Sequence, residues 1–448
     1  MERPWQPRHA RIAGAFALAY AVSAGGASAQ EPRLEVGENV HVSTESPDVV
    51  HVEPAITASP TDPSRLVAAS MVVRDPHSQD FQDSWGIVAY ASRDGGRSWS
   101  RRPLPGLPAD WVAGDVWLAW SADDVVYLSC VVSESMLRGK PVSTWAFRST
   151  DGGWTWSEPE RDIFVPGTTQ DHPVIAWAAR ADGSPVVYGF GSVASKGAEG
   201  IELTVLDAAS HRFRPLDPYL VNRPTVNLGN GVVLLDGGLL FTYFTMPEIP
   251  RGYWAVHIDP TGRRTELRLR KSIVPVGFPT LAVDRSHGAF SGRAYAAWVE
   301  GADERDERDL RVLVSSSDEG GRTWSAPRRV HRHAVPTQRT LPAIAVNDQG
   351  VVAVSWMDWR SSPDRSDCPE LYWAASTDGG ASFQPEVRIS TERACFGTAA
   401  NGGAARRWRL GGGDYLVMTA AADGSFHPIW SDGRTGVSQI WTAAIRRR

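Results

Sequence analysis

Side chains that could do chemistry recur near the starts of a series of similar segments along this 448-residue chain. They are Glu53, Asp115, Asp171, His172, Arg223, Arg339, Asp414 and Tyr415. Carboxylates beside a tyrosine and arginines could act as acid and base on a glycosidic bond, with the remaining groups binding the substrate. The carboxylate oxygens could instead hold a hard cation such as calcium, or all these groups could cap strands and bond neighbouring loops. The choice depends on the elements that position them.

Four segments of one pattern identify the repeating element. They are SRDGGRSW at 92–99, STDGGWTW at 149–156, SDEGGRTW at 317–324 and STDGGASF at 376–383, and we call them the Gly-Gly turns. Each follows an apolar or alternating run and precedes a short extended stretch, which predicts strand, tight turn, strand. The Ser and Asp side chains can bond turn amides, the glycines supply positive φ, and the closing aromatic packs onto the sheet. In the third turn, either Glu319 replaces the Asp or one residue is inserted after Asp318.

The spacing of the Gly-Gly turns predicts a β-propeller. The first two turns lie 57 residues apart, the last two 59, and the middle interval of 168 residues equals three periods of 56. Two degenerate turns are therefore expected at Asp207 and Asp259. Seven segment starts occur over 361 residues, and repeats of about 60 residues holding four short strands are typical of propeller blades.

The predicted fold is therefore an all-β propeller of seven four-stranded blades, with six blades as the alternative. The chain ends about three strands into the last blade, so the N-terminal stretch 33–44 is expected to supply the fourth strand. That closure would join the termini and remove open sheet edges. Most of the 19 tryptophans recur at repeat positions and are expected to pack between strands. Asp358/Arg360 and Asp432/Arg434 are expected to form ion pairs within blades.

Composition excludes several functional classes. With 42% hydrophobic residues the chain is too apolar for disorder, and a net charge of −5 gives no electrostatic footprint for nucleic acid or an anionic membrane. Three cysteines are too few for a disulfide scaffold or a four-cysteine zinc cluster. No spacing typical of a zinc site, a phosphate-binding loop or a serine-hydrolase elbow occurs, so no metal ligands are assigned.

The N-terminus is typical of a secretory signal peptide. Residues 1–29 combine a basic start, an apolar run at 12–24 that is too short to span a bilayer, and small residues before Gln30. Residues 30–448 are then expected to form one exported domain, secreted or periplasmic, monomeric and without a membrane span. In an oxidising compartment Cys368 could pair with Cys395; three buried, inert thiols are the alternative.

The Gly-Gly turns resemble Asp boxes, also called BNR repeats, of the sialidase superfamily, over nearly the whole mature chain. The chain is similar to secreted bacterial BNR-repeat proteins in its EPAI segment at 53–56, its turns, and its terminal GDY…WSDGR blade. The resemblance implies a propeller with each box between the third and fourth strands of a blade, away from the active site. It also implies a glycan or glycoconjugate partner and glycoside hydrolase activity at the channel mouth.

The resemblance also implies site residues. The family places its acid/base Asp between the first strand and the first box, so Asp80 and Asp83 in the loop 74–85 are candidates, with Arg74 as a nearby cation. A tyrosine nucleophile would be Tyr415, in the last blade.

Two positions depart from the sialidase pattern. Val52 stands where the first substrate-binding arginine should be, and an apolar side chain cannot pair with a carboxylate. Asn230 stands where a glutamate should activate the tyrosine, and an amide cannot accept that proton. We therefore expect a sialidase-like glycan-cleaving enzyme without standard exo-sialidase activity, needing no cofactor, with calcium as the one ion to consider. The alternatives are a non-catalytic propeller that binds glycan or protein, and an assembly factor of the cell envelope.

Overall fold

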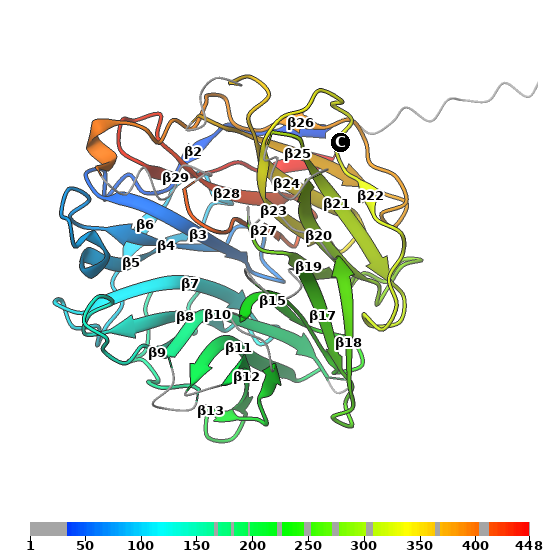
Figure 1. Cartoon of the computed structure of the whole chain (residues 1–448), viewed down its shortest axis with the longest axis horizontal. Coiled ribbons are helices and arrows are strands. Elements are labelled where there is room, and N and C mark those ends of the chain that lie inside the picture. Colours follow the sequence, from blue (N-terminus) through cyan, green and yellow to red (C-terminus); the bar gives the residue numbers. More distant parts are fainter. Residues whose placement is uncertain are drawn as a thin grey trace, which may run out of the picture.

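The structure is a computed structural model. It describes residues 34–164, 169–180, 183–195, 198–221, 226–245, 252–270, 277–301, 308–362, 368–402 and 412–447. The chain forms seven antiparallel sheets arranged as blades around a central axis (Figure 1). This confirms the predicted seven-bladed, all-β propeller, and the six-bladed alternative is wrong.

Each blade runs outward from an inner strand. The inner strands are β3 (Val50–Ala58), β7 (Val112–Trp120), β10 (Thr169–Ala179), β15 (Val226–Val233), β19 (Thr280–Val283), β23 (Arg339–Val346) and β27 (Val417–Ala420). The second strands are β4 (Leu66–Val73), β8 (Val126–Ser133), β11 (Pro185–Ser195), β16 (Leu239–Thr245), β20 (Ala294–Gly301), β24 (Val352–Asp358) and β28 (Phe426–Asp432). Neighbouring inner strands touch all the way round, and β27 contacts β3 to close the ring.

The two outer layers complete the blades. The third strands are β5 (Trp85–Ser92), β9 (Ser143–Ser149), β12 (Ala198–Asp207), β17 (Gly252–Ile258), β21 (Leu310–Ser317), β25 (Glu370–Ser376) and β29 (Gln439–Thr442). The outermost strands are β6 (Ser100–Arg102), β13 (Arg212–Pro215), β18 (Arg264–Arg270), β22 (Arg328–Arg329), β26 (Val387–Arg388) and β2 (Val40–His41). In the second blade the outermost position is a single bridge between Ala146 and Glu160. Smaller elements are β1 (Leu34–Val36), β14 (Tyr219–Val221), β30 (Ile445–Arg447), η1 (Phe81–Ser84) and η2 (Ala399–Asn401).

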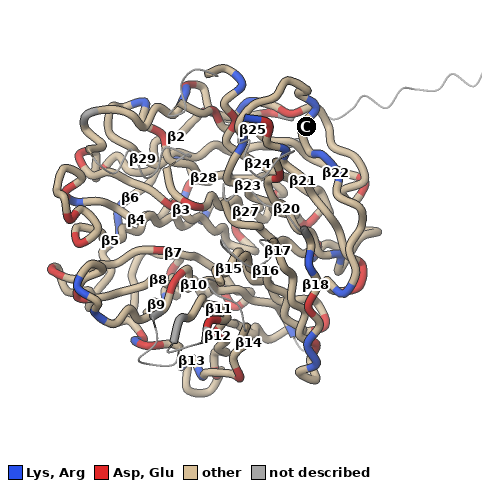
Figure 2. The backbone as a smooth tube through the Cα atoms, viewed as in Figure 1, with Lys and Arg blue, Asp and Glu red and all other residues tan. Residues whose placement is uncertain are grey.

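Burial follows the layers of each blade. Every residue of β3, β4 and β8 is buried, because both faces of these strands pack against neighbouring strands or blades. Apolar runs there are consequently continuous, whereas β22 at the rim is exposed at both positions. Trp120, Trp298, Trp356, Trp373 and Trp430 are among the largest fully buried side chains, as expected of packing residues. Charged positions lie mainly in loops and outer strands (Figure 2).

The N-terminal stretch closes the last blade as predicted. β2 pairs with β29, with Val40 opposite Thr442 and His41 opposite Trp441, and so supplies the fourth strand. β1 pairs with β30 beside it. The termini of the described chain are thereby held in one sheet. The predicted signal peptide, 1–29, lies outside the described residues, among which no helix has the length and apolarity needed to cross a membrane.

The four Gly-Gly turns lie between third and fourth strands, where the sequence predicts them. In the first, Asp94 Oδ1 accepts hydrogen bonds from the backbone amides of Arg97 and Ser98 at 2.9 Å, and Ser92 Oγ accepts one from Gly96. The turns at 149–156 and 376–383 repeat this arrangement. In the third turn, Glu319 takes the Asp position and accepts from the Thr323 hydroxyl, so no residue is inserted. The degenerate turns at Asp207 and Asp259 also follow third strands.

Asp94→Ala is expected to destabilise the protein by about 1–2 kcal/mol, because the turn amides lose their acceptor. Burial alone would raise the pKa of Asp94, but hydrogen bonds from Ser98, Ser92 and Arg97 hold it below 3.8. The stabilisation is therefore present above pH 3.8 and is lost as pH falls through the lowered pKa. Thermal melts between pH 2 and 7 test this, with the exposed Asp348→Ala as control; a deficit that does not shrink in acid contradicts it.

Cross-links and ion pairs agree with two sequence expectations. Arg360 pairs with Asp358 at 2.7 Å and Arg434 with Asp432 at 2.5 Å, each within its own blade. Cys368 and Cys395 form a disulfide, so the alternative of three free thiols is wrong. Cys130 is free and buried, and burial raises the pKa of its thiol.

Candidate functional site

A β-bulge interrupts the inner strand of five blades at an equivalent place. The register with the second strand shifts between Val52 and Ala55, Gly114 and Trp117, Asp171 and Val174, Leu228 and Asn230, and Thr340 and Ala343. A bulge leaves a residue outside the ladder and re-aims its side chain. These bulges lie in the N-terminal parts of the inner strands, so the redirected side chains gather at one end of the channel.

Four of the bulges hold a non-glycine residue in the left-handed backbone region. Glu53, Asp115, His172 and Leu341 have φ between 46° and 53°. That conformation costs a non-glycine residue about 1–2 kcal/mol, and glycine, which stands at the fourth-blade bulge as Gly229, would avoid the cost. Three of these equivalent strained positions hold ionisable side chains, namely Glu53, Asp115 and His172. Backbone strain at such residues indicates a functional role for their side chains.

Six of the predicted residues meet in one pocket of about 220 Å³, which we call the acidic pocket. Its predicted members are Glu53, Asp115, Asp171, His172, Asp414 and Tyr415. The remaining lining residues are Met71, Trp85, Asn227 and Phe278. No lysine or arginine lines it among the described residues. Six of the ten lining residues are thus ones that the sequence singled out.

Asp171 and Asp115 form a carboxyl pair within the acidic pocket. Asp171 lines the pocket with part of its side chain exposed there, while neighbouring protein atoms surround its carboxyl. Burial there raises the pKa of Asp171 well above its ordinary value, reinforced by the charge of Asp115, a hydrogen bond with it, and the charge of Asp414. The backbone amide of His172 donates to Asp115 Oδ2 at 3.3 Å. The raised pKa favours the protonated form of Asp171, whose carboxyl is hydrogen-bonded to the Asp115 carboxyl beside it.

Aromatic rings form one wall of the acidic pocket. The His172 ring lies 4.5 Å from Phe278 and 5.0 Å from Tyr415, between ring centroids, and Trp117 lies 5.7 Å from Tyr415. Burial lowers the pKa of His172, so its imidazole is neutral. Its Nε2 atom has no hydrogen-bond partner among the residues the structure describes, and His172 is 4% exposed. This nitrogen is available to a ligand in the pocket.

The Tyr415 hydroxyl is held as a donor. It gives its hydrogen to the Val116 carbonyl oxygen at 3.1 Å, and no carboxylate of the described residues is hydrogen-bonded to it. Burial, followed by the charges of Glu53, Asp115 and Asp414, raises the pKa of Tyr415 well above its usual value. A tyrosine nucleophile needs a base that removes its proton, and this arrangement keeps the proton in place.

The three loop residues suggested by the family resemblance do not line the acidic pocket. Asp83 accepts hydrogen bonds from the Ser135 hydroxyl and the Met136 amide, both at 2.9 Å, and so ties its loop to the second blade. Asp80 is exposed at the start of η1 and makes no capping bond there. Arg74 donates to the Ala109 carbonyl at 3.1 Å. The structure thus gives Asp83 a structural role.

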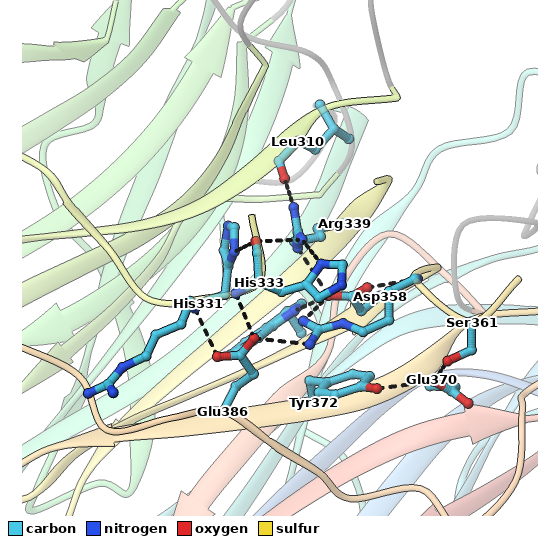
Figure 3. Close-up of polar contacts among 12 residues, drawn as sticks. Leu310, His331, His333, Arg339, Asp358, Ser361, Glu370, Tyr372 and Glu386 are labelled. Carbon is cyan, nitrogen blue, oxygen red and sulfur yellow. Dashed lines mark hydrogen bonds and ion pairs between the residues drawn. The ribbon is translucent and has the colours of Figure 1, made fainter. Parts of the chain in front are cut away.

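Arg339, which the sequence suggested as a substrate contact, does not line the acidic pocket either. Its guanidinium is fully buried, with Nε donating to Asp358 Oδ2 at 3.0 Å and Nη1 to the Leu310 carbonyl at 2.6 Å (Figure 3). Asp358 also accepts from Arg360, which reaches Glu386 at 3.0 Å. This network joins the fifth and sixth blades.

The bulge register explains the error at Arg339. In the sixth blade Leu341, not Arg339, occupies the bulge position that Glu53 holds in the first blade. Arg339 is equivalent to His51, two residues earlier, which is likewise fully buried. Side chains before the bulge therefore pack inside the propeller. The other predicted arginine, Arg223, lies outside the described residues.

Sequence reasoning missed four lining residues. Phe278 and Asn227 stand at the starts of repeat segments, as Glu53 does. Their position in the repeat therefore indicated the pocket, but only ionisable residues and Tyr415 were predicted from that position. Met71 and Trp85 come from the second and third strands of the first blade and carry no such signal. Within the described part of the chain, no three His, Cys, Asp or Glu side chains are placed to hold a metal ion.

Comparison with known proteins finds similar structures but no related sequence. No protein-family model matches the chain, and no curated protein matches it. A protein of unknown function from Dyadobacter fermentans is similar in structure, with a TM-score of 0.51 and 12% identity over 93% of this chain and 99% of that one. A PL25 ulvan lyase gives a TM-score of 0.50 with 10% identity, covering 91% and 98% of the two chains. These likenesses establish a shared propeller fold.

One sialidase is also similar. A Hadza microbial sialidase, Hz136, gives a TM-score of 0.46 with 16% identity, covering 89% of this chain and 66% of that one. At such identities no residue role transfers, so the chemistry of this chain must be argued from its own pocket.

Proposed function

We propose that this propeller is a glycan-cleaving enzyme, a glycoside hydrolase whose chemistry takes place in the acidic pocket. The observation that supports it is the Asp115–Asp171 pair, in which one carboxyl keeps its proton beside a carboxylate. Cleavage of a glycosidic bond needs an acid for the leaving oxygen and a carboxylate for water or for the sugar. Two solitary surface carboxylates would both be ionised at neutral pH and could not divide these roles.

Each pocket residue has a role in this proposal. Asp171 donates its proton to the leaving glycosidic oxygen, and the neighbouring charge of Asp115 keeps that proton in place beforehand. Glu53 or Asp414 supplies the second carboxylate, and the Asp414 amide lies 3.4 Å from Glu53 Oε1. His172 Nε2 bonds a sugar hydroxyl, while Phe278 offers an apolar face.

Standard exo-sialidase activity is not part of the proposal. Val52 is buried in a cluster with Met71 and Val73, so it offers a sialic acid carboxylate no partner. Asn230 lines a different cavity, and Tyr415 bonds a backbone carbonyl. We expect activity on a fluorogenic sialoside to be at least two orders of magnitude below that on the true substrate.

The proposal extends to export and to the family. The Gly-Gly turns have the residue types and positions of Asp boxes, and the Cys368–Cys395 disulfide suits an oxidising compartment. We therefore propose an exported, monomeric Asp-box propeller that needs no cofactor. Calcium is not invoked in its chemistry.

The testing experiment is an activity screen of the purified protein on sialosides, uronate-bearing glycans and neutral glycans. Turnover of at least one glycan that is lost in Asp171→Asn supports the enzyme. A glycan that binds without turnover, with graded loss of affinity in that variant, supports instead a binding propeller, which the aromatic wall of Phe278 and Tyr415 could serve. Turnover that survives in Asp171→Asn contradicts the assigned acid.

The activity is expected to have a bell-shaped pH profile. Asp171 must be protonated, so kcat/KM falls as pH rises through its raised pKa. The second carboxylate must be ionised, so kcat/KM also falls in acid. Neutralising Asp115 as Asp115→Asn removes the charge that raises the pKa of Asp171 and is expected to move the alkaline limb to lower pH. An alkaline limb that stays in place in this variant contradicts the pairing.

A further inference from the structure

A second cavity of about 220 Å³ lies in the channel, beyond the aromatic wall of the acidic pocket. It is lined by the C-terminal parts of the inner strands, including Ile175, Val232 and Met418. Trp117 lines this cavity and Tyr415 lines the acidic pocket, and their rings lie 5.7 Å apart. The aromatic layer therefore stands between the two spaces. We call the second space the Arg285 cavity.

Arg285 is the one charged residue that lines this cavity among those described. It follows β19, and its Nη2 donates to the Trp177 carbonyl at 3.0 Å and the Val233 carbonyl at 2.6 Å. A guanidinium carries five N–H donors, so those on Nε and Nη1 have no partner in the described protein. No Asp or Glu lines the cavity to balance its charge.

The charge of Arg285 persists at neutral pH. Burial lowers the pKa of Arg285, but only to about 10, so the guanidinium remains cationic under ordinary conditions. Arg285 is exposed where it lines the cavity, and no acidic side chain lines the described cavity to pair with it, so an anion that enters would meet an unpaired cation. The structure therefore provides both a positive charge and space beside it.

We propose that the Arg285 cavity binds a small organic carboxylate, such as a sugar acid. One guanidinium balances one negative charge, which suits a monoanion better than a phosphate dianion. The lining beside it mixes apolar side chains with the polar groups of Thr57, Asn230 and Thr419, which suits an organic body bearing hydroxyls. This inference does not rest on the proposed glycan cleavage, because it concerns the opposite end of the channel.

Arg285 also has a structural role that the test must separate from binding. By bonding carbonyls of β10 and β15 it ties the third and fourth blades to the fifth. A purely structural arginine would lower stability when removed but would show no dependence on carboxylate. Binding must therefore be measured directly on folded protein.

The experiment is isothermal titration of the full protein with sodium glucuronate and sodium acetate, against glucose and sodium chloride. We expect saturable 1:1 binding of glucuronate, weaker binding of acetate, and none of glucose. Arg285→Gln is expected to weaken glucuronate binding at least tenfold. The control is Arg180→Gln, an exposed arginine in the loop after β10, which should bind as the wild type does.

A second variant keeps the test valid if Arg285→Gln fails to fold. Ala176→Leu leaves Arg285 in place but fills part of the cavity that Ala176 lines, and it is expected to weaken glucuronate binding at least tenfold as well. Glucuronate binding that is unchanged in the folded variants, or no carboxylate binding by the wild type, overturns the proposal. Equal binding of chloride and glucuronate overturns the assigned ligand class.

Discussion

Asp171→Asn is expected to reduce glycan cleavage by a factor of about 10²–10⁴ while raising the thermal stability of the protein. Asparagine keeps the size of the side chain but has no proton of suitable acidity to give to a leaving oxygen. The loss should therefore appear in kcat rather than in KM. Few substitutions in a protein abolish activity and stabilise the fold together, so the combination is diagnostic.

The stability gain follows from the sign of the pKa shift. The pKa of Asp171 is raised above 3.8 in the folded state, so the folded protein favours the protonated carboxyl. The contribution of this carboxyl to the free energy of unfolding is complete below pH 3.8 and is lost as pH rises through the raised pKa. Above it, the folded protein must hold a third negative charge beside Asp115 and Asp414. Asparagine removes that charge, and we expect the melting temperature to rise by roughly 1–3 °C at pH 7–8 and not at all below pH 4.

The matched control for Asp171→Asn is Asp83→Asn. Asp83 is an acid that the sequence also suggested, but it bonds Ser135 and Met136 away from the acidic pocket. Its asparagine variant should keep wild-type kcat and lose some stability, the opposite of Asp171→Asn. Full activity in Asp171→Asn, or its loss in a folded Asp83→Asn, would move the acid back to the loop that the family resemblance favours.

Arg339→Met is expected to lower the free energy of unfolding by about 3–5 kcal/mol with no change in kcat for the molecules that remain folded. Methionine fills a similar volume, but it leaves the Leu310 carbonyl without its hydrogen-bond donor. It also removes one of the two cations that contact the fully buried Asp358. Burial alone would raise the pKa of Asp358, and Arg360 together with Arg339 keeps it lowered. The contribution of Arg339 to that compensation would be gone, while that of Arg360 would remain.

Chemical denaturation and activity measured on the same samples test this prediction. The control is Arg264→Met, whose partner Asp217 is 85% exposed at its side chain, and which should cost less than about 1 kcal/mol. An Arg339→Met protein of normal stability but impaired turnover would restore Arg339 to substrate binding.

The sequence by itself determined the repeating unit and the end of the channel where the ionisable groups gather. The Gly-Gly turns form from contacts within about four residues, such as the amide of Ser98 on Asp94, so their chemistry is visible in the local sequence. Their spacing favours seven blades, and the seven sheets of the structure exclude the six-bladed alternative. Because every blade starts with a strand on the axis, residues at equivalent segment starts, such as Glu53 and Asp414, meet without further information.

Only the tertiary structure decided which side chain enters the acidic pocket and what state it holds there. In five of the seven blades a bulge adds one residue to the inner strand, and in the sixth blade it falls at Leu341, so Arg339 stands before the bulge and packs inside the propeller. The raised pKa of Asp171 and its hydrogen bond with Asp115 depend on the approach of two blades, and the position of Arg285 depends on the carbonyls of β10 and β15 that it bonds. Such distances arise from packing between residues far apart in the chain, which local patterns do not encode.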